Sequence, residues 1–179
     1  MTLANMHDLF EWKLQMVYSS EKRILEMLED AARDVESAEL REAFEHHREE
    51  TRGQVERIEK VFDTLHRRPR SIDASVVEGL VEEKRRFLNE DPEGPMMDIY
   101  HVAAGMKTEH MEIAAYESLL SLAEQMGAHD LAEPLRKNLE EEQATLHKLS
   151  GFAKKLSMEA SAAPSSDKGG DAQTHTLKQ

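Results

Sequence analysis

Hydrophobic residues recur along most of the chain at alternating steps of three and four positions. This spacing places side chains on one face of an α-helix. Long helices are predicted at about residues 7–33, 38–66, 95–126 and 131–158, and a shorter, more polar helix at about 76–89. In chain order, the four long apolar seams are Phe10, Leu14, Val17, Ile24 and Leu28; Leu40, Phe44, Ile58, Val61 and Leu65; Val102, Met106, Ile113, Tyr116 and Leu120; and Leu135, Leu139, Leu146, Leu149 and Ala153.

The connections between these helices predict how they are arranged. The breaks near residues 34–37 and 127–130 are short, so each should join two antiparallel neighbours. The middle connection contains the turn sequences RRPRSIDAS and DPEGP as well as the short helix. Two short turns and one long crossover are typical of an all-α, ferritin-like four-helix bundle. A simple bundle with an additional surface helix is the alternative. We expect the bundle in residues 1–158 and a disordered tail in 159–179, which is rich in Ser, Gly, Ala and Pro.

Composition excludes several classes of function. Aromatic residues make up 5% of the chain and no segment shows sustained β alternation, so a sheet is not expected. The net charge of -13 disfavours nucleic acid as a partner. The chain has no cysteine, which excludes disulfides, thiolate zinc sites and iron–sulfur clusters. Neither a signal peptide nor an apolar stretch long enough for a membrane span is recognisable, so a cytoplasmic protein with no membrane partner is predicted.

Each long seam is interrupted by polar residues. The first seam is interrupted by Glu21. The second is interrupted by His47, Thr51 and Gln54, and Glu50 lies beside them. The third is interrupted by Glu109, with Glu112 one turn on, and the last is interrupted by Glu142, with Thr145 one turn on. At about 1.5 Å of rise per residue, the carboxylates fall near one level of the bundle. Buried like charges repel each other unless cations or protons neutralise them. Carboxylate and imidazole ligands suit two divalent metal ions, with iron or manganese favoured over zinc, and a proton-sharing polar core is the alternative.

Residues beside these interruptions could support the ligands. His110 is a candidate to orient a ligand, and Tyr18 and Tyr116 could donate hydrogen bonds to ligand carboxylates. An ordinary packing role is the alternative for each of the three.

Four segments carry a resemblance to a known family. They are LFEWKLQMVYSSEKRIL, FEHHREETRGQVERIEKVF, KTEHMEIAAYESLLSLAEQMG and LEEEQATLHKL. Over about residues 3–156 the chain resembles the YciF-like bacterial stress proteins of the ferritin-like superfamily. The most specific marks are His-x-x-Glu-Thr from His47 and Glu-His-x-Glu-Ile-Ala from Glu109. The resemblance implies a rubrerythrin-like bundle, a homodimer and a dinuclear metal site.

Comparison with rubrerythrin-type sites implies roles for individual residues. Glu21, Glu109 and Glu112 match those sites by type, whereas His47 precedes Glu50 in reversed order and Thr145 stands where a histidine is expected. Glu50, with Glu112 or Glu142, is expected to bridge the two metals. Glu21, His47 and Glu109 are expected to be terminal ligands, each bound to one metal. Such a centre could reduce peroxide or oxidise ferrous iron, with electrons from an external donor protein because the chain has no cysteine. The alternative is a non-enzymatic, stress-induced dimer whose metal site is structural or vestigial.

Overall fold

The computed structural model describes residues 3–162, which form helices without any strand. The four long helices are α1 (Met6–Asp34), α2 (Ala38–Thr64), α4 (Gly94–Gln125) and α5 (His129–Ala162). The shorter helix α3 (Ser75–Leu88) lies between α2 and α4 in the sequence. The prediction of an all-α protein is therefore confirmed.

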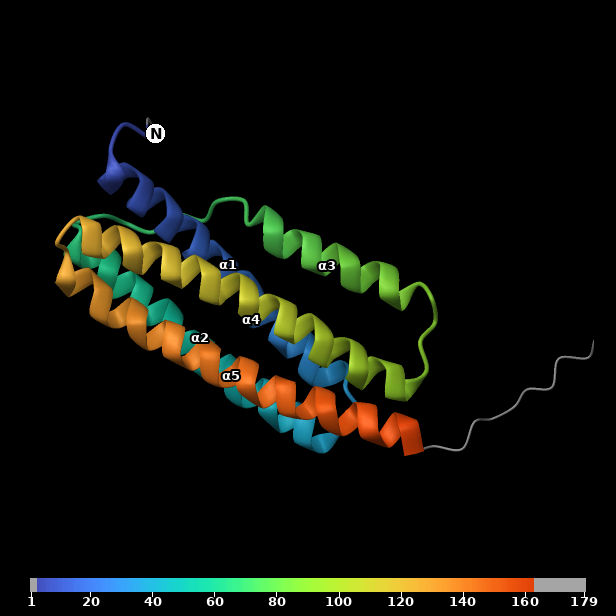
Figure 1. Cartoon of the computed structure of the whole chain (residues 1–179). Coiled ribbons are helices and arrows are strands. Elements are labelled where there is room, and N and C mark those ends of the chain that lie inside the picture. Colours follow the sequence, from blue (N-terminus) through green and yellow to red (C-terminus); the bar gives the residue numbers. More distant parts are fainter. Residues whose placement is uncertain (1–2, 163–179) are drawn as a thin grey trace, which may run out of the picture.

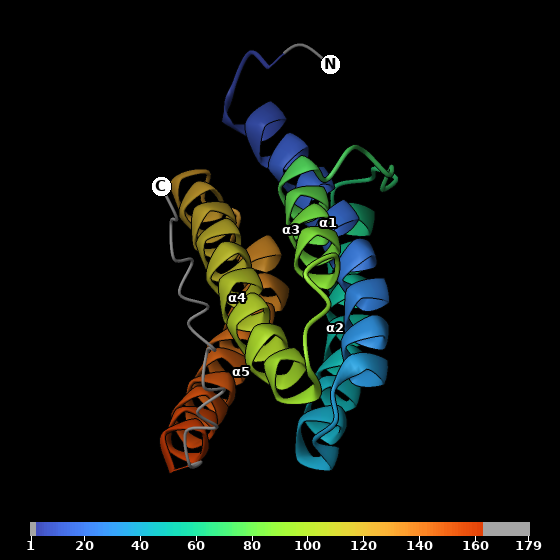
Figure 2. The same ribbon diagram turned by 90° about the vertical axis from the view of Figure 1, so that its right-hand side faces the viewer.

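The four long helices form a bundle in which each helix has two neighbours. Helix α1 packs on α2 and α4, and α5 packs on the same two helices from the other side. Sequential partners run antiparallel, and α3 lies along the outside of the bundle over α1 and α4 (Figures 1 and 2). This helix carries the chain from the end of α2 back to the opposite end of the bundle, where α4 begins. The ferritin-like topology is confirmed.

Helix boundaries follow local capping chemistry. The Asn5 side chain accepts a hydrogen bond from the Asp8 amide at the start of α1 (3.0 Å), and Ser37 caps α2 in the same way. Gly127 ends the turn after α4 with a φ of 67°, a conformation that glycine adopts without strain. Helix α5 continues through Pro134 and reaches Ala162, beyond its predicted end near Met158. The rest of the predicted tail, residues 163–179, lies outside the described residues.

Buried polar side chains anchor both ends of the crossover. The side-chain oxygen of Gln15 accepts a hydrogen bond from the Arg70 amide (2.6 Å), and its side-chain nitrogen donates to the Arg68 carbonyl (3.3 Å). The Ser19 hydroxyl accepts a hydrogen bond from the Ile72 amide (2.9 Å). At the other end, Asp98 accepts from the backbone amides of residues 36 and 37, in the turn between α1 and α2. These contacts satisfy loop amides that would otherwise lack partners. They hold α3 and α4 in register with α1.

Two apolar clusters fill the two ends of the bundle, with a polar layer between them. One cluster is built around Phe10, Phe62 and Leu135, and the other around Ile24, Leu40 and Phe44. The polar layer therefore lies at mid-length, enclosed on both sides by hydrocarbon.

None of the helices within residues 3–162 has the length and apolar character required to cross a lipid bilayer.

The buried stripes of α4 and α5 differ in part from the predicted seams. Met106, Ile113, Leu139 and Leu146 are only half-buried. On α5, the innermost positions are Leu135, Asn138, Glu142, Thr145 and Leu149. Since these positions also follow steps of three and four, the helix period alone does not choose between the two stripes. The polar residues Asn138 and Thr145 take the innermost positions, so Leu139 and Leu146 lie beside the buried stripe, where Leu139 still packs against the core.

Candidate metal centre

Five of the six predicted ligands meet in the polar layer. Each of the four long helices contributes at least one: Glu21 from α1, His47 from α2, Glu109 and Glu112 from α4, and Glu142 from α5. Every one of these residues is at most 3% exposed. The interrupted seams thus converge at one level, with ionisable groups enclosed by the bundle.

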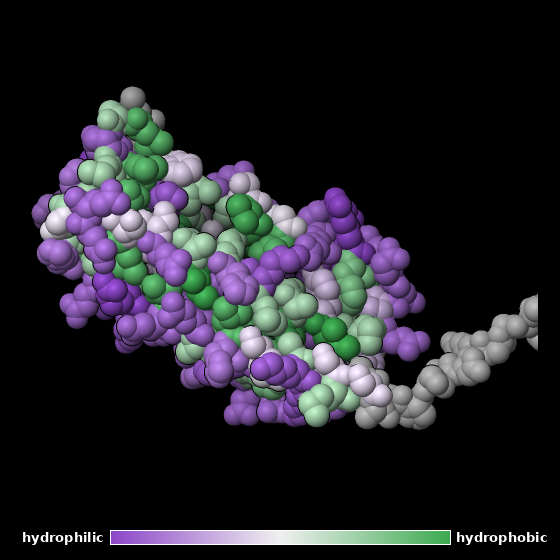
Figure 3. Space-filling view, viewed as in Figure 1, coloured by the Kyte–Doolittle hydropathy of each residue, from purple (hydrophilic) through white to green (hydrophobic). Residues whose placement is uncertain are grey.

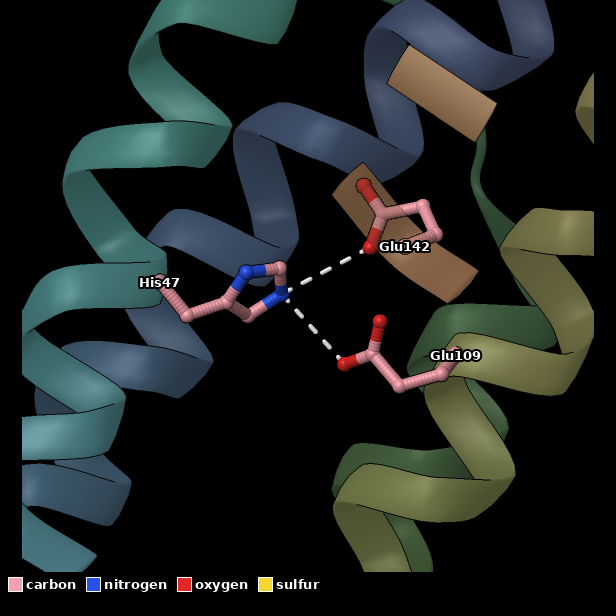
Figure 4. Close-up of side chains that lie close together, drawn as sticks. All are labelled: His47, Glu109 and Glu142. Carbon is pink, nitrogen blue, oxygen red and sulfur yellow. Dashed lines mark ion pairs between the residues drawn. The ribbon is translucent and has the colours of Figure 1, made fainter. Parts of the chain in front are cut away.

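The ligand atoms fall into two groups that share one residue. His47, Glu109 and Glu142 form the first, and Glu21, Glu112 and Glu142 form the second. In each group, one atom per residue lies within 4.8 Å of the others. The His47 ring points between two helices, with Nε2 3.3 Å from Glu109 Oε1 and 3.6 Å from Glu142 Oε2 (Figure 4). Glu142 therefore lies between two potential cation positions.

Glu50 is the predicted ligand that lies outside both groups. Its side chain is 23% exposed, and Oε2 lies 3.4 Å from Nδ1 of His47, on the opposite edge of the ring from Nε2. Its other oxygen lies 3.3 Å from Nε2 of the exposed His46. Thr145 Oγ1 is also 3.2 Å from His47 Nδ1. Glu50 and Thr145 are therefore placed to orient the imidazole, an arrangement that metal-bound histidines commonly show.

Unpartnered polar atoms test whether a cation fits this layer. Within the described part of the chain, six ligand atoms are buried without a hydrogen-bond partner. They are Glu21 Oε2, His47 Nε2, Glu109 Oε2, Glu112 Oε1 and both carboxylate oxygens of Glu142. Leaving ionisable groups buried and unpaired is costly. Divalent cations would satisfy these atoms at once, so the residues present fit a metal centre.

The protonation behaviour of the layer reflects burial and mutual repulsion. Burial raises the pKa of Glu21 to about 7, although the Tyr116 hydroxyl opposes the shift. Burial and the neighbouring carboxylates also raise the pKa values of Glu112 and Glu142 well above their ordinary value. For His47, burial lowers the pKa, but Glu109 and Glu50 outweigh this and raise it to about 9. Without a cation, the layer therefore holds protons near neutral pH.

A chain of hydrogen bonds leads from the rim of the bundle to Glu21. Arg57 donates to Oδ1 of Asn138, and the amide nitrogen of Asn138 donates to the Tyr116 hydroxyl (2.8 Å). The Tyr116 hydroxyl donates in turn to Glu21 Oε1. Arginine can only donate, so it fixes which end of the Asn138 amide faces Tyr116 and hence where the tyrosine proton points. One oxygen of Glu21 is thereby engaged, and Oε2 remains free.

Sequence reasoning found part of this environment. Tyr116 does contact a candidate ligand, whereas Tyr18 donates to Glu59 instead (3.0 Å). His110 is exposed, so the role of ligand-orienting residue proposed for it is wrong. Asn138 and Arg57 were missed. Asn138 lies one turn before Glu142, and this i, i+4 relation was the available signal.

The whole bundle corresponds to one known protein family. Residues 5–162 match the family described as domain of unknown function DUF892. The chain belongs to the DUF892 family. The predicted resemblance to YciF-like proteins is confirmed, because this DUF892 chain is 36% identical to protein YciF of Escherichia coli over 154 residues. That alignment covers 86% of this chain and 93% of YciF.

Solved structures agree with the family assignment. The crystal structure of the E. coli stress protein YciF matches with a TM-score of 0.83 and 35% identity, over 88% of this chain and 99% of that one. YcfI from Rhodopseudomonas palustris matches with a TM-score of 0.80 and 31% identity, over 83% and 94%. A dodecameric thioferritin from Bacteroides fragilis matches with a TM-score of 0.68 at 15% identity, over 89% and 93%. This last likeness shows the ferritin-like fold of the DUF892 chain and nothing further.

Proposed function

We propose that the polar layer binds two divalent metal ions. His47, Glu109 and Glu142 would hold one ion, and Glu21, Glu112 and Glu142 the other. The observation that carries this proposal is the set of unpartnered, buried ligand atoms from all four long helices. Four ionised carboxylates carry four negative charges, which two divalent cations would balance. The mixture of oxygen ligands with one imidazole suits iron or manganese, and zinc as a third option.

The centre would act in stress protection by reducing peroxide or oxidising ferrous iron. Two redox-active ions bound here would supply one electron each to an oxygen–oxygen bond. Residues around the centre would hold the ligand side chains in place and exclude bulk water. Glu50 and Thr145 hold the ring of His47, while Tyr116 holds Glu21. The apolar clusters at both ends of the bundle shield the layer.

Sustained turnover would require electrons from outside the bundle. The chain has no cysteine and so cannot carry an iron–sulfur centre of its own. We therefore propose an external electron-donor protein in the same compartment, which the sequence predicts to be the cytoplasm. Continued peroxide consumption with NADH as the only reductant and no second protein would contradict this.

A second function is favoured by the two departures from a rubrerythrin-type ligand set. Glu50 faces the outer edge of His47, and Thr145 contacts the ring where those sites have a second histidine. A site with one nitrogen ligand could hold a metal for stability alone, in a stress-induced protein without enzymatic activity. Peroxide consumption and ferrous oxidation by metal-loaded protein distinguish the two functions.

Metal analysis tests the centre itself. Protein purified without chelator and saturated with ferrous iron or manganese should hold two ions per chain. Glu142→Gln removes the residue common to both groups and should reduce this content strongly. Glu140→Gln, two positions away on the exposed face of α5, is the matched control and should bind like the parent. Parent protein that stays empty at saturating metal would exclude the proposal.

We also propose that the chain forms a homodimer through α3 and the residues that flank it. Part of the apolar surface of this region is used within the chain, since Val77 is fully buried and Phe87 stacks on Tyr100 with centroids 4.0 Å apart. Leu88 at the end of α3 and Met96 in the first turn of α4 remain exposed and are the centre of the proposed interface. Analytical ultracentrifugation should give a dimer, and Met96→Glu should shift it towards monomer.

A further inference from the structure

A cavity opens beside the polar layer, on the face where the start of α3 approaches α1 and α4. Its volume is about 260 Å³. Seven apolar residues line it together with Lys13, Ser20 and Glu112, and they are Trp12, Met16, Val17, Ala74, Val76, Met111 and Ala115. Hydrophobic residues gather near the first turn of α3 in Figure 3. The cavity is therefore a mainly apolar space that is open to solvent.

This cavity reaches the proposed metal centre through Glu112. That carboxylate is 3% exposed, lacks a partner at Oε1, and belongs to both the cavity wall and the second ligand group. Two other hollows touch the layer, at Glu109 and at His47 with Glu50, but they measure about 80 and 40 Å³. An apolar cavity of about 150 Å³ suffices for benzene. Of the three, the cavity beside Glu112 has room for an organic group.

The lining selects the chemistry of the occupant. Tryptophan and methionine side chains offer a polarisable surface that packs well on aromatic or branched alkyl groups. Lys13 is the one positive group among the lining residues, whereas Glu112 lies among other carboxylates and the chain carries a net charge of -13, so an anion would meet net repulsion. A cation could be held by the carboxylates, but the apolar walls would desolvate it on the way in. The remaining class is an uncharged molecule with an apolar body.

We propose that this cavity binds an uncharged organic molecule with an aromatic or branched alkyl body, and that the substrate class of the centre is an organic hydroperoxide. The second half of the proposal rests on the function proposed above. Reduction of a hydroperoxide breaks its O–O bond and takes up two protons and two electrons, giving an alcohol and water. The electrons come from the external donor protein. The apolar body would occupy the space beside Trp12, with the reacting end towards Glu112.

Binding can be measured without metal, because the only tryptophan of the chain lines the cavity. The probe is 2-phenyl-2-propanol, the alcohol formed from cumene hydroperoxide. Titration into metal-free protein should change Trp12 fluorescence in a saturable manner. Ala115→Leu fills the cavity and should weaken binding about tenfold or more. Ala114→Leu adds the same side chain at the adjacent, exposed position and should leave binding unchanged.

A second measurement addresses the substrate class. With metal-loaded protein and a reductant, Ala115→Leu should raise the KM for cumene hydroperoxide while leaving the KM for hydrogen peroxide unchanged, because hydrogen peroxide does not need the cavity. An equal change for both substrates would overturn the substrate assignment. An unsaturable fluorescence change, the same affinity in both alanine variants, or a face covered by a second copy of the chain would overturn the binding site. Saturable binding without any turnover would refute the redox function and leave the site standing.

Discussion

The side-chain amide of Asn138 donates a 2.8 Å hydrogen bond to the Tyr116 hydroxyl, and this contact joins α5 to α4 beside Glu21. Both side chains are fully buried. Because Arg57 occupies the amide oxygen of Asn138, only the amide nitrogen can face the tyrosine. The Tyr116 proton is then directed to Glu21. A residue outside the ligand set thus determines how one of the ligands is held.

Replacing Asn138 should affect both stability and metal binding. Asn138→Leu keeps the approximate size of the side chain but removes the acceptor of Arg57 Nε and the donor to the Tyr116 hydroxyl, while Arg57 keeps Glu141 and Tyr116 keeps Glu21. A cost of about 1–3 kcal/mol in the free energy of unfolding is expected. Metal affinity should fall as well, because Glu21 loses its fixed orientation. Denaturant unfolding and metal titration measure the two effects. Lys137→Ala, at the exposed neighbouring position, should change neither.

The stability of the metal-free protein should fall as the pH rises. The folded-state pKa of Glu21 is raised from 4.5 to about 7, so the folded state keeps a proton that the unfolded state releases between these values. His47, raised from 6.5 to about 9, acts in the same direction over a higher window. The stability that these two groups contribute is therefore fully present below pH 4.5 and is lost progressively up to about pH 9. Metal-free protein should melt at a lower temperature at pH 8 than at pH 6. An unchanged or higher Tm at pH 8 would contradict the buried carboxylate layer.

Metal should reverse this loss, since it replaces the protons and binds the folded arrangement. At a hundredfold excess over its dissociation constant, a ligand stabilises the folded state by about 2.7 kcal/mol. The increase in Tm with manganese should be larger at pH 8 than at pH 6, because fewer protons compete there. Thermal melts with and without manganese at the two pH values provide the measurement. A larger increase at pH 6 would exclude competition between protons and metal.

Two glutamates on α4 should respond differently to neutralisation. Burial, followed by the charges of Glu21 and Glu109, raises the pKa of Glu112, so Glu112→Gln should reduce the loss of stability between pH 6 and pH 8. Glu109 lies 3.3 Å from Nε2 of His47, so Glu109→Gln should lower the Tm of metal-free protein by removing the negative charge that faces the buried imidazole. Both variants should weaken the metal effect. Equal shifts in Tm for the two metal-free variants would be inconsistent with the two groups described here.

Glu50 should act on the metal through His47. The histidine hydrogen bond lowers the pKa of Glu50, and Glu50 helps to raise that of His47. In Glu50→Gln the pKa of His47 should move down, and metal affinity should fall about 10- to 100-fold, as for other residues that orient metal ligands. The stoichiometry of two ions should be retained, since Glu50 belongs to neither ligand group. NMR titration of the imidazole and competition with a metal indicator give these values, and Glu49→Gln on the exposed face is the control.

The sequence alone was sufficient for the helices, their topology and the level of the polar layer. Seams such as Phe10, Leu14 and Val17 follow the helix period, because burial of an apolar stripe is what stabilises a helix in a bundle. Connection lengths then determined the ferritin-like order of the helices. The interruptions at Glu21, His47 and Glu142 were visible because a charged residue at an inward position is rare unless it has a partner.

Only the tertiary structure decided how these side chains face each other. Helical spacing placed His47 and Glu50 on one face, but the direction of each side chain depends on the neighbouring helices. Glu50 consequently lies at Nδ1, on the outer edge of the ring, while Nε2 faces Glu109 and Glu142. Likewise, the choice of Asn138 over Leu139 as the inward residue depends on partners that come from α2 and α4. A periodic pattern gives the angular position of a residue on its own helix, whereas contacts between helices require the rotation of each helix about its axis, which packing sets.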